Sequence, residues 1–236
     1  MNRQAQSVVM FLFGGAILRA SLTDTYLRYV KEGLRPFLVV AGVLLVTAAM
    51  LTLWHDLRGR GGRAGDDHGH HEPQVGWLLI LPALGLLLVT PPALGAYAAG
   101  QSGTVLSAQA SDSSFPALPP GDPLPVALVE YATRAVFDEG RGMRGRTFQL
   151  TGFVTPGPDG APMLTRMVLS CCAADGRPIK IGMVGDVPGE LPPDTWVRIL
   201  GTYSTRVDKD PINQAGVPYV DVQSWQQIAA PRRQYE

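Results

Sequence analysis

The residues best suited to chemistry are two adjacent cysteines, which stand in the run Ser170-Cys171-Cys172-Ala173-Ala174-Asp175. Thiolates and carboxylates bind Zn²⁺ and similar ions, so Cys171, Cys172 and Asp175 are candidate metal ligands. The pair lacks the second pair of cysteines that a structural zinc site needs. The sequence therefore establishes no cofactor and offers zinc as the candidate, in a site that needs further ligands such as Asp221.

Two other interpretations of the cysteine pair stay open. Because successive residues of a strand point to opposite faces, Cys171 would join Met163, Met167 and Leu169 as a small buried hydrophobe. Alternatively, Cys171 and Cys172 could form a disulfide. That bond would close a strained eight-membered ring, would be readily reduced, and would need an oxidising compartment.

A second set of candidate metal ligands lies in the run Asp66-Asp67-His68-Gly69-His70-His71-Glu72. Imidazole nitrogens interleaved with carboxylates suit Zn²⁺ and similar divalent ions. Five glycines between residues 59 and 69 make this loop flexible, so a site built from His68, His70 and His71 would be labile and of low affinity. The alternative is a hydrophilic connector with incidental histidines.

Two function classes are disfavoured by composition and motifs. The 20 Lys and Arg balance the 20 Asp and Glu, whereas a general nucleic-acid binder carries a basic excess. The sequence has no nucleophile elbow, phosphate loop or HExxH motif, and no histidine after residue 71 to serve as a general base. We therefore expect neither nucleic-acid binding nor an enzyme.

The elements that must position these residues begin with membrane helices. Charged residues make up 17% of the chain, against roughly 25% in typical soluble domains, and the deficit falls in the first hundred residues. Residues 36–54 carry no charge, and neither do residues 73–111, whose apolar centre is residues 77–96. A weaker helix is expected from residue 7 to about residue 30. These lengths predict about three transmembrane helices in the lipid bilayer.

The arginines favour one orientation and one division into domains. Arg58, Arg60 and Arg63 precede a stretch, residues 74–129, without Lys or Arg. The positive-inside rule then places that loop in the cytoplasm and the C-terminal domain outside, although the basic residues of 19–35 oppose this. We expect three parts: a transmembrane region with a histidine-rich loop at 55–76, a Ser/Pro-rich tether, and an extracytoplasmic β domain; their bounds are residues 1–99, 100–125 and 126–236.

The C-terminal domain is expected to be a helix followed by five strands. Asp122-Pro123 predicts the start of a helix that puts Val126, Val129, Thr133 and Val136 on one face and ends near Gly140. Five β-patterned segments follow at even spacing, which favours a small OB-like Greek-key barrel, with a small sandwich as the alternative. The segments are residues 146–155, 162–172, 178–185, 194–204 and 218–228.

With these segments placed, the chain resembles one family of uncharacterised bacterial membrane proteins described as permease subunits. The resemblance covers nearly the full chain, and Ser-Cys-Cys-Ala-Ala-Asp in a β domain is its most specific part. The other matching features are residues 14–19, residues 26–30, Arg35-Pro36, Ala41-Gly42, the His/Asp loop and Pro91-Pro92. The resemblance implies a polytopic permease as partner, similar to predicted ArsP-like permeases, and a link to zinc or other metal homeostasis.

Three functional hypotheses follow from the residues and the resemblance together. The first is an accessory subunit of a bacterial membrane permease complex, located in the cell membrane as a multi-pass protein. The second is a stand-alone membrane-anchored protein that binds or senses metal through Cys171, Cys172 and the histidine loop. The third is a thiol-redox membrane protein that uses the same two cysteines.

Overall fold

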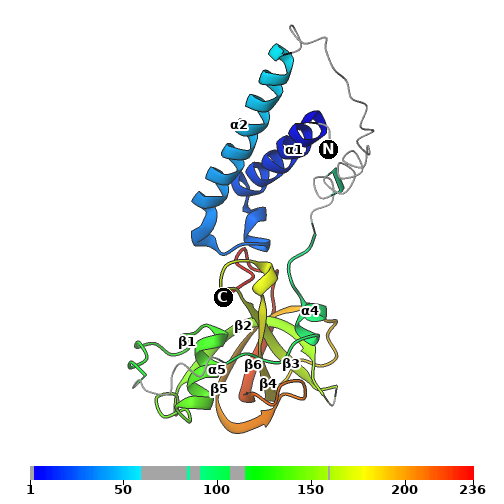
Figure 1. The fold of residues 1–236 in the computed structure, drawn as a ribbon. Helices are drawn as coiled ribbons and strands as arrows, with labels where there is room; N and C mark the ends of the chain where they lie inside the picture. Colours follow the sequence, from blue (N-terminus) through cyan, green and yellow to red (C-terminus); the bar gives the residue numbers. More distant parts are fainter. Residues whose placement is uncertain (1–2, 60–83, 86–90, 107–114, 159) are drawn as a thin grey trace. The chain divides into compact units, whose positions relative to one another are not determined.

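The computed structural model describes residues 3–59, 84–85, 91–106, 115–158 and 160–236 (Figure 1). The chain divides into two compact units, Met1–Pro92 and Ala93–Glu236. The named elements of the first unit, among its described residues, are helices, and the second unit is built around a β-barrel.

The first unit is a pair of packed helices, α1 (Arg3–Leu22) and α2 (Arg35–Gly59), joined by the short 3-10 helices η1 (Asp24–Arg28) and η2 (Glu32–Leu34). The helices approach closely where both lack side chains. A Cβ on Gly14 would lie 2.9 Å from Val46 Cγ2, and one on Gly42 would lie 2.8 Å from Leu18 Cγ. Small residues at a crossing allow this kind of backbone approach.

The prediction of about three N-terminal transmembrane helices is wrong. Among the described residues, one helical stretch is long and apolar enough to cross a membrane, Glu32–Arg58, with 27 residues and a mean hydropathy of 2.4. The helix expected to reach residue 30 ends at Leu22. Beyond it Thr23 has extended backbone and caps η1, with its Oγ1 accepting from Thr25 N at 3.4 Å.

The third expected helix, residues 77–96, falls largely outside the described residues. Its described end, residues 91–95, is not helical, because Pro92 has no amide hydrogen and restricts the residue before it. The short helix α4 (Ala96–Gly100) that follows belongs to the second unit.

The second unit is a closed barrel of five strands, β2 (Thr147–Pro156), β3 (Pro162–Val168), β4 (Arg177–Gly185), β5 (Trp196–Lys209) and β6 (Gly216–Gln227). The order is β2-β3-β4-β6-β5, and the β2–β5 pairing closes the barrel. Strands β4 and β6 are parallel, and the other pairs around the barrel are antiparallel. The expected OB-like barrel is therefore present.

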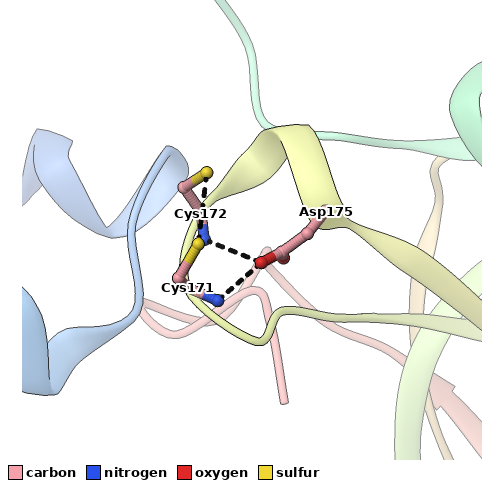
Figure 2. Close-up of side chains that lie close together, drawn as sticks. All are labelled: Cys171, Cys172 and Asp175. Carbon is pink, nitrogen blue, oxygen red and sulfur yellow. Dashed lines mark hydrogen bonds between the residues drawn. The ribbon is translucent and has the colours of Figure 1, made fainter.

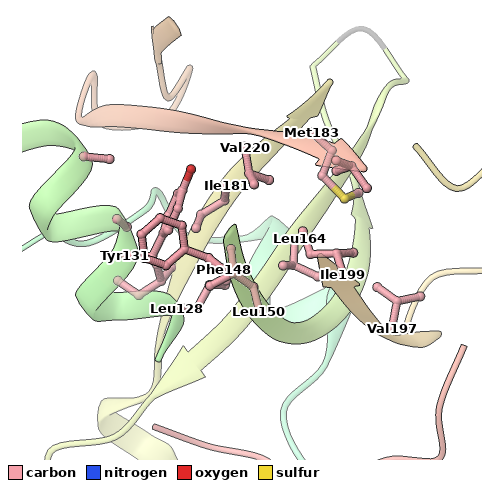
Figure 3. Close-up of a cluster of buried hydrophobic side chains, with 14 of the residues drawn as sticks. Leu128, Tyr131, Phe148, Leu150, Leu164, Ile181, Met183, Val197, Ile199 and Val220 are labelled. Carbon is pink, nitrogen blue, oxygen red and sulfur yellow. The ribbon is translucent and has the colours of Figure 1, made fainter. Parts of the chain in front are cut away.

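The core of the barrel comes from alternating positions of its strands (Figure 3). Phe148 and Leu150 on β2, Leu164 on β3, Ile181 on β4 and Ile199 on β5 are each fully buried. The period of two predicted for residues 146–155 is confirmed, since Phe148, Leu150 and Val154 all point inward.

One helix, α5 (Leu128–Phe137), packs on the barrel core through Leu128 and Tyr131. The Tyr131 ring meets Phe148 edge-on at 5.5 Å between centroids, and its hydroxyl donates to the Tyr219 carbonyl at 2.9 Å. Burial raises the pKa of this hydroxyl far above its ordinary value. A fully buried phenol thus keeps one hydrogen bond, as buried tyrosines generally do.

The expected start of this helix at Asp122-Pro123 is wrong. Strand β1 (Leu124–Pro125) pairs in parallel with β2 there, so helical backbone begins only after Ala127. The first amides of α5 are capped by Glu236, whose Oε1 accepts from Leu128 N at 2.9 Å and whose Oε2 accepts from Val129 N at 3.0 Å. The buried face is correspondingly different from the predicted one and consists of Leu128, Tyr131, Ala132, Arg134 and Ala135.

Part of the stretch expected to be a tether packs onto the barrel. Thr104 is fully buried; its amide donates to Asp210 Oδ2 at 2.8 Å, and its Oγ1 accepts from Lys180 N at 3.0 Å. Further along, the carbonyl of Pro116 accepts from Arg134 Nη2 at 2.9 Å. The β unit accordingly begins at Ala93 and includes residues well before 126.

Candidate metal centre

The Cys-Cys-Asp loop connects β3 to β4. After β3 ends at Val168, the chain continues to the 3-10 helix η5 (Ala173–Asp175). The Asp175 carboxylate folds back on this loop: Oδ1 accepts from Ser170 N at 3.0 Å, and Oδ2 accepts from Cys171 N at 2.7 Å and Cys172 N at 3.4 Å. Three consecutive amides thus converge on one carboxylate, and Figure 2 shows the two from Cys171 and Cys172.

This turn brings the two thiols side by side. The Cys171 and Cys172 sulfurs lie 3.6 Å apart, within hydrogen-bonding distance, and both cysteines are free. One ligand atom from each of Cys171, Cys172 and Asp175 lies within 4.8 Å of the others. The three residues therefore form a group that could hold a metal ion, as the sequence indicated.

The charges of the group work against a thiolate while no cation is bound. Hydrogen bonding to the Asp175 carboxylate, and then to Cys172, raises the pKa of Cys171 to about 11. Hydrogen bonds from the Cys171 thiol and amide lower the pKa of Asp175 in turn. At neutral pH the group therefore holds a carboxylate beside a protonated Cys171 thiol, and a cation that binds there has to displace that proton.

The alternative that treats Cys171 as a buried hydrophobe is wrong. Strand alternation stops at Val168, and Leu169 is the last buried residue before the turn. Beyond it the backbone follows the Asp175 hydrogen bonds, so Cys171 is exposed and Cys172 is half-buried. The raised pKa of Cys171 also disfavours a nucleophilic thiolate, which the thiol-redox hypothesis needs.

A contact that the sequence did not reveal holds the base of the loop. The last residues of the chain run parallel to β3, with Met167 bridged to Tyr235. The amide of Leu169 donates to the Glu236 carbonyl at 3.0 Å, and the amide of Glu236 donates to the Met167 carbonyl at 3.0 Å. No local pattern signals this pairing, because it joins segments more than sixty residues apart.

The structure can place only one of the remaining candidate ligands, Asp221. His68, His70 and His71 lie outside the described residues. Asp221 is exposed on β6 and is not part of the cluster formed by Cys171, Cys172 and Asp175.

Comparison with known proteins gives one match. The sequence model of the DUF1980 C-terminal domain, an uncharacterised family, matches residues 136–236. The matched region contains all five barrel strands and the Cys-Cys-Asp loop. No curated protein and no solved structure shows significant similarity to the chain.

Asp175→Asn should make Cys171 react faster with iodoacetamide near pH 8. The substitution removes the negative acceptor that raises the pKa of Cys171, so the pKa falls and the thiolate fraction at a given pH rises. In the unchanged protein, the rate should keep rising by about tenfold per pH unit beyond pH 9. Peptide mass spectrometry with fragmentation between the two cysteines measures the rate at Cys171.

The exposed Asp186 offers a matched control, because Asp186→Asn removes the same charge from another loop of the same unit. Equal alkylation rates in the unchanged protein and in Asp175→Asn, or a rate that levels off below pH 9, would contradict this description of the site.

Proposed function

We propose that the protein is a membrane-anchored metal-binding subunit whose barrel carries a thiophilic divalent ion, Zn²⁺ being the best fit, at Cys171, Cys172 and Asp175. The observation that carries this proposal is the spacing of 3.6 Å between the two sulfurs. Two thiolates on one tetrahedral Zn²⁺, each about 2.3 Å from the ion, lie about 3.8 Å apart. Both sulfurs can therefore reach one ion with little movement of the backbone.

The number and exposure of the ligands suit an ion that enters and leaves. Structural zinc sites are closed by four protein ligands, whereas this group supplies three among the described residues and leaves a position open. Cys171 is exposed, so an incoming ligand can approach the ion from solvent. These properties favour capture and transfer of an ion over a purely structural role.

The proposed anchor is α2. Its side chains are apolar and largely exposed in the unit that contains it, including Phe37 at 70%, Leu44 at 63% and Leu51 at 64%. Apolar surface of this extent is suited to lipid or to the helices of a partner. On the basis of the family resemblance, we propose that this partner is a polytopic permease and that this chain is its accessory subunit.

An extracytoplasmic barrel is the orientation we propose, and it requires a second membrane crossing between Arg63 and Ala93, a stretch that lies largely outside the described residues. Three arginines, Arg58, Arg60 and Arg63, precede a stretch without Lys or Arg up to residue 129, and basic loops concentrate on the cytoplasmic side. A membrane-impermeant maleimide added to intact cells at mildly alkaline pH, where more of the raised-pKa thiol is ionised, should then label the exposed Cys171. Labelling that occurs only after the cells are broken would place the barrel in the cytoplasm instead.

Zinc titration of the full chain in detergent tests the metal proposal. We expect one tight site, weakened by at least about 100-fold in Cys171→Ser/Cys172→Ser, because losing two direct ligands exceeds the 10–100-fold cost of losing an outer partner. Because zinc has to displace the Cys171 proton, the zinc affinity should rise by about tenfold per pH unit below the pKa of Cys171, if that proton alone is released.

The triple variant His68→Ala/His70→Ala/His71→Ala is the matched control. It should keep the tight site and lose at most a weak one. An affinity that is unchanged in the cysteine variant but lost in the histidine variant would place the metal in the histidine loop and overturn the assignment to the barrel.

Affinity purification from native membranes tests the permease partner separately. A tagged chain should co-purify with a polytopic membrane protein, and Cys171→Ser/Cys172→Ser should retain that protein because the proposed contacts are made by helices. Recovery of the chain without a polytopic protein would remove the partner from the proposal and leave the metal site standing.

A further inference from the structure

A cavity of about 580 Å³ lies in the barrel unit, away from the three candidate metal ligands, none of which lines it. It is bounded by the turn between β2 and β3, by the hairpin of β5 and β6, and by the face of β4. Its volume falls within the range of sites for small organic molecules. The charges and apolar surfaces along its wall indicate which kind of molecule it suits.

One part of the wall is apolar. Met163 on β3 and Met183 on β4 line this part; they are largely buried, and their flexible side chains can adapt to irregular ligands. Pro162 and Ile212 extend this surface, and Ile212 is 54% exposed. The cavity therefore offers contact area for an apolar body.

Another part carries a buried ammonium group. Lys180 is only 9% exposed, and its Nζ donates to the Ser102 carbonyl at 2.7 Å and to Asp210 Oδ2 at 3.3 Å. An ammonium has three donors, so one is left over from these two hydrogen bonds, and Lys180 is one of the residues that line the cavity. The exposed Lys209 lines the same cavity.

The carboxylates of the cavity are already engaged within the barrel unit. Asp210 is 1% exposed and accepts from Thr104 N and Ile212 N in addition to Lys180. Hydrogen bonds to these amides, together with Lys180, lower the pKa of Asp210 against the opposing effect of its burial.

Asp208 is engaged in the same way. It accepts from Arg206 Nη2 at 2.6 Å and from Tyr219 Oη at 2.7 Å, while the Arg206 guanidinium stacks on the Tyr219 ring at 4.1 Å. Each carboxylate is thus matched by one cation, Asp210 by Lys180 and Asp208 by Arg206. Lys209 leaves the cavity with one net positive charge.

We propose that this cavity binds a small organic anion with an apolar body. The anionic group would lie against the part of the wall formed by Lys180, which supplies a donor, and Lys209, which supplies the unbalanced positive charge. The apolar body would lie against Met163, Met183 and Ile212. This site is separate from the Cys-Cys-Asp group and does not depend on metal binding.

Fluorine NMR with a matched pair of probes tests the proposal. The full chain is placed in phosphatidylcholine nanodiscs, with empty nanodiscs as the blank. We expect saturable binding of para-trifluoromethylbenzoate and weaker binding of para-trifluoromethylbenzamide, which has the same body without the charge. Absence of saturable benzoate binding, or equal affinity for the two probes, would overturn the proposal.

Two substitutions at Ile212 separate the effect of charge in the cavity on benzoate binding from the effect of losing the apolar side chain. Ile212→Lys and Ile212→Asp both remove the apolar side chain, but Ile212→Lys should bind the benzoate about two- to fivefold more tightly than Ile212→Asp. Arg198→Gln, which neutralises an exposed cation on β5 that does not line the cavity, and Cys171→Ser/Cys172→Ser should both leave the affinity unchanged. Identical affinities in the two Ile212 variants, or a loss of binding in either control, would contradict the assignment to this cavity.

Discussion

The carboxylate of Asp175 accepts hydrogen bonds from the backbone amides of Ser170, Cys171 and Cys172. These three hydrogen bonds determine where the two sulfurs lie. Without them, the residues after β3 would continue in extended backbone and the two side chains would point apart. The same carboxylate raises the pKa of Cys171. One side chain therefore shapes the loop, supplies a candidate oxygen ligand, and keeps the neighbouring thiol protonated until a cation replaces the proton.

The rest of the β unit supports this loop from both sides. The closed barrel fixes the ends of β3 and β4, and the C-terminal segment pairs with Met167 and Leu169 just before the turn. Glu236 also caps the first amides of α5, so the segment that braces the loop also anchors the helix on the barrel core. A site placed on such a braced turn keeps its geometry better than one on a free loop.

The parts that could be predicted from sequence are those with local signals. The strands follow from alternation, as at Phe148 and Leu150, and the Cys-Cys-Asp group lies within five residues. What failed depended on competing or distant contacts. Thr23 has extended backbone and caps η1 where α1 was expected to continue, β1 occupies the expected start of α5, and the cap of α5 comes from a residue over one hundred positions away. Strand periodicity predicted a buried Cys171, which is wrong, because periodicity takes no account of the hydrogen bonds from the loop amides to Asp175.

X-ray absorption spectroscopy at the zinc edge of the zinc-loaded chain tests the central claim most directly, because it counts the atoms bound to the ion. Loaded with one equivalent of zinc, the chain should show two sulfurs at about 2.3 Å with lighter ligands at about 2.0–2.2 Å. That result would place both Cys171 and Cys172 on a single ion. A first shell made of nitrogen and oxygen alone would contradict the account and remove the cysteines from the site.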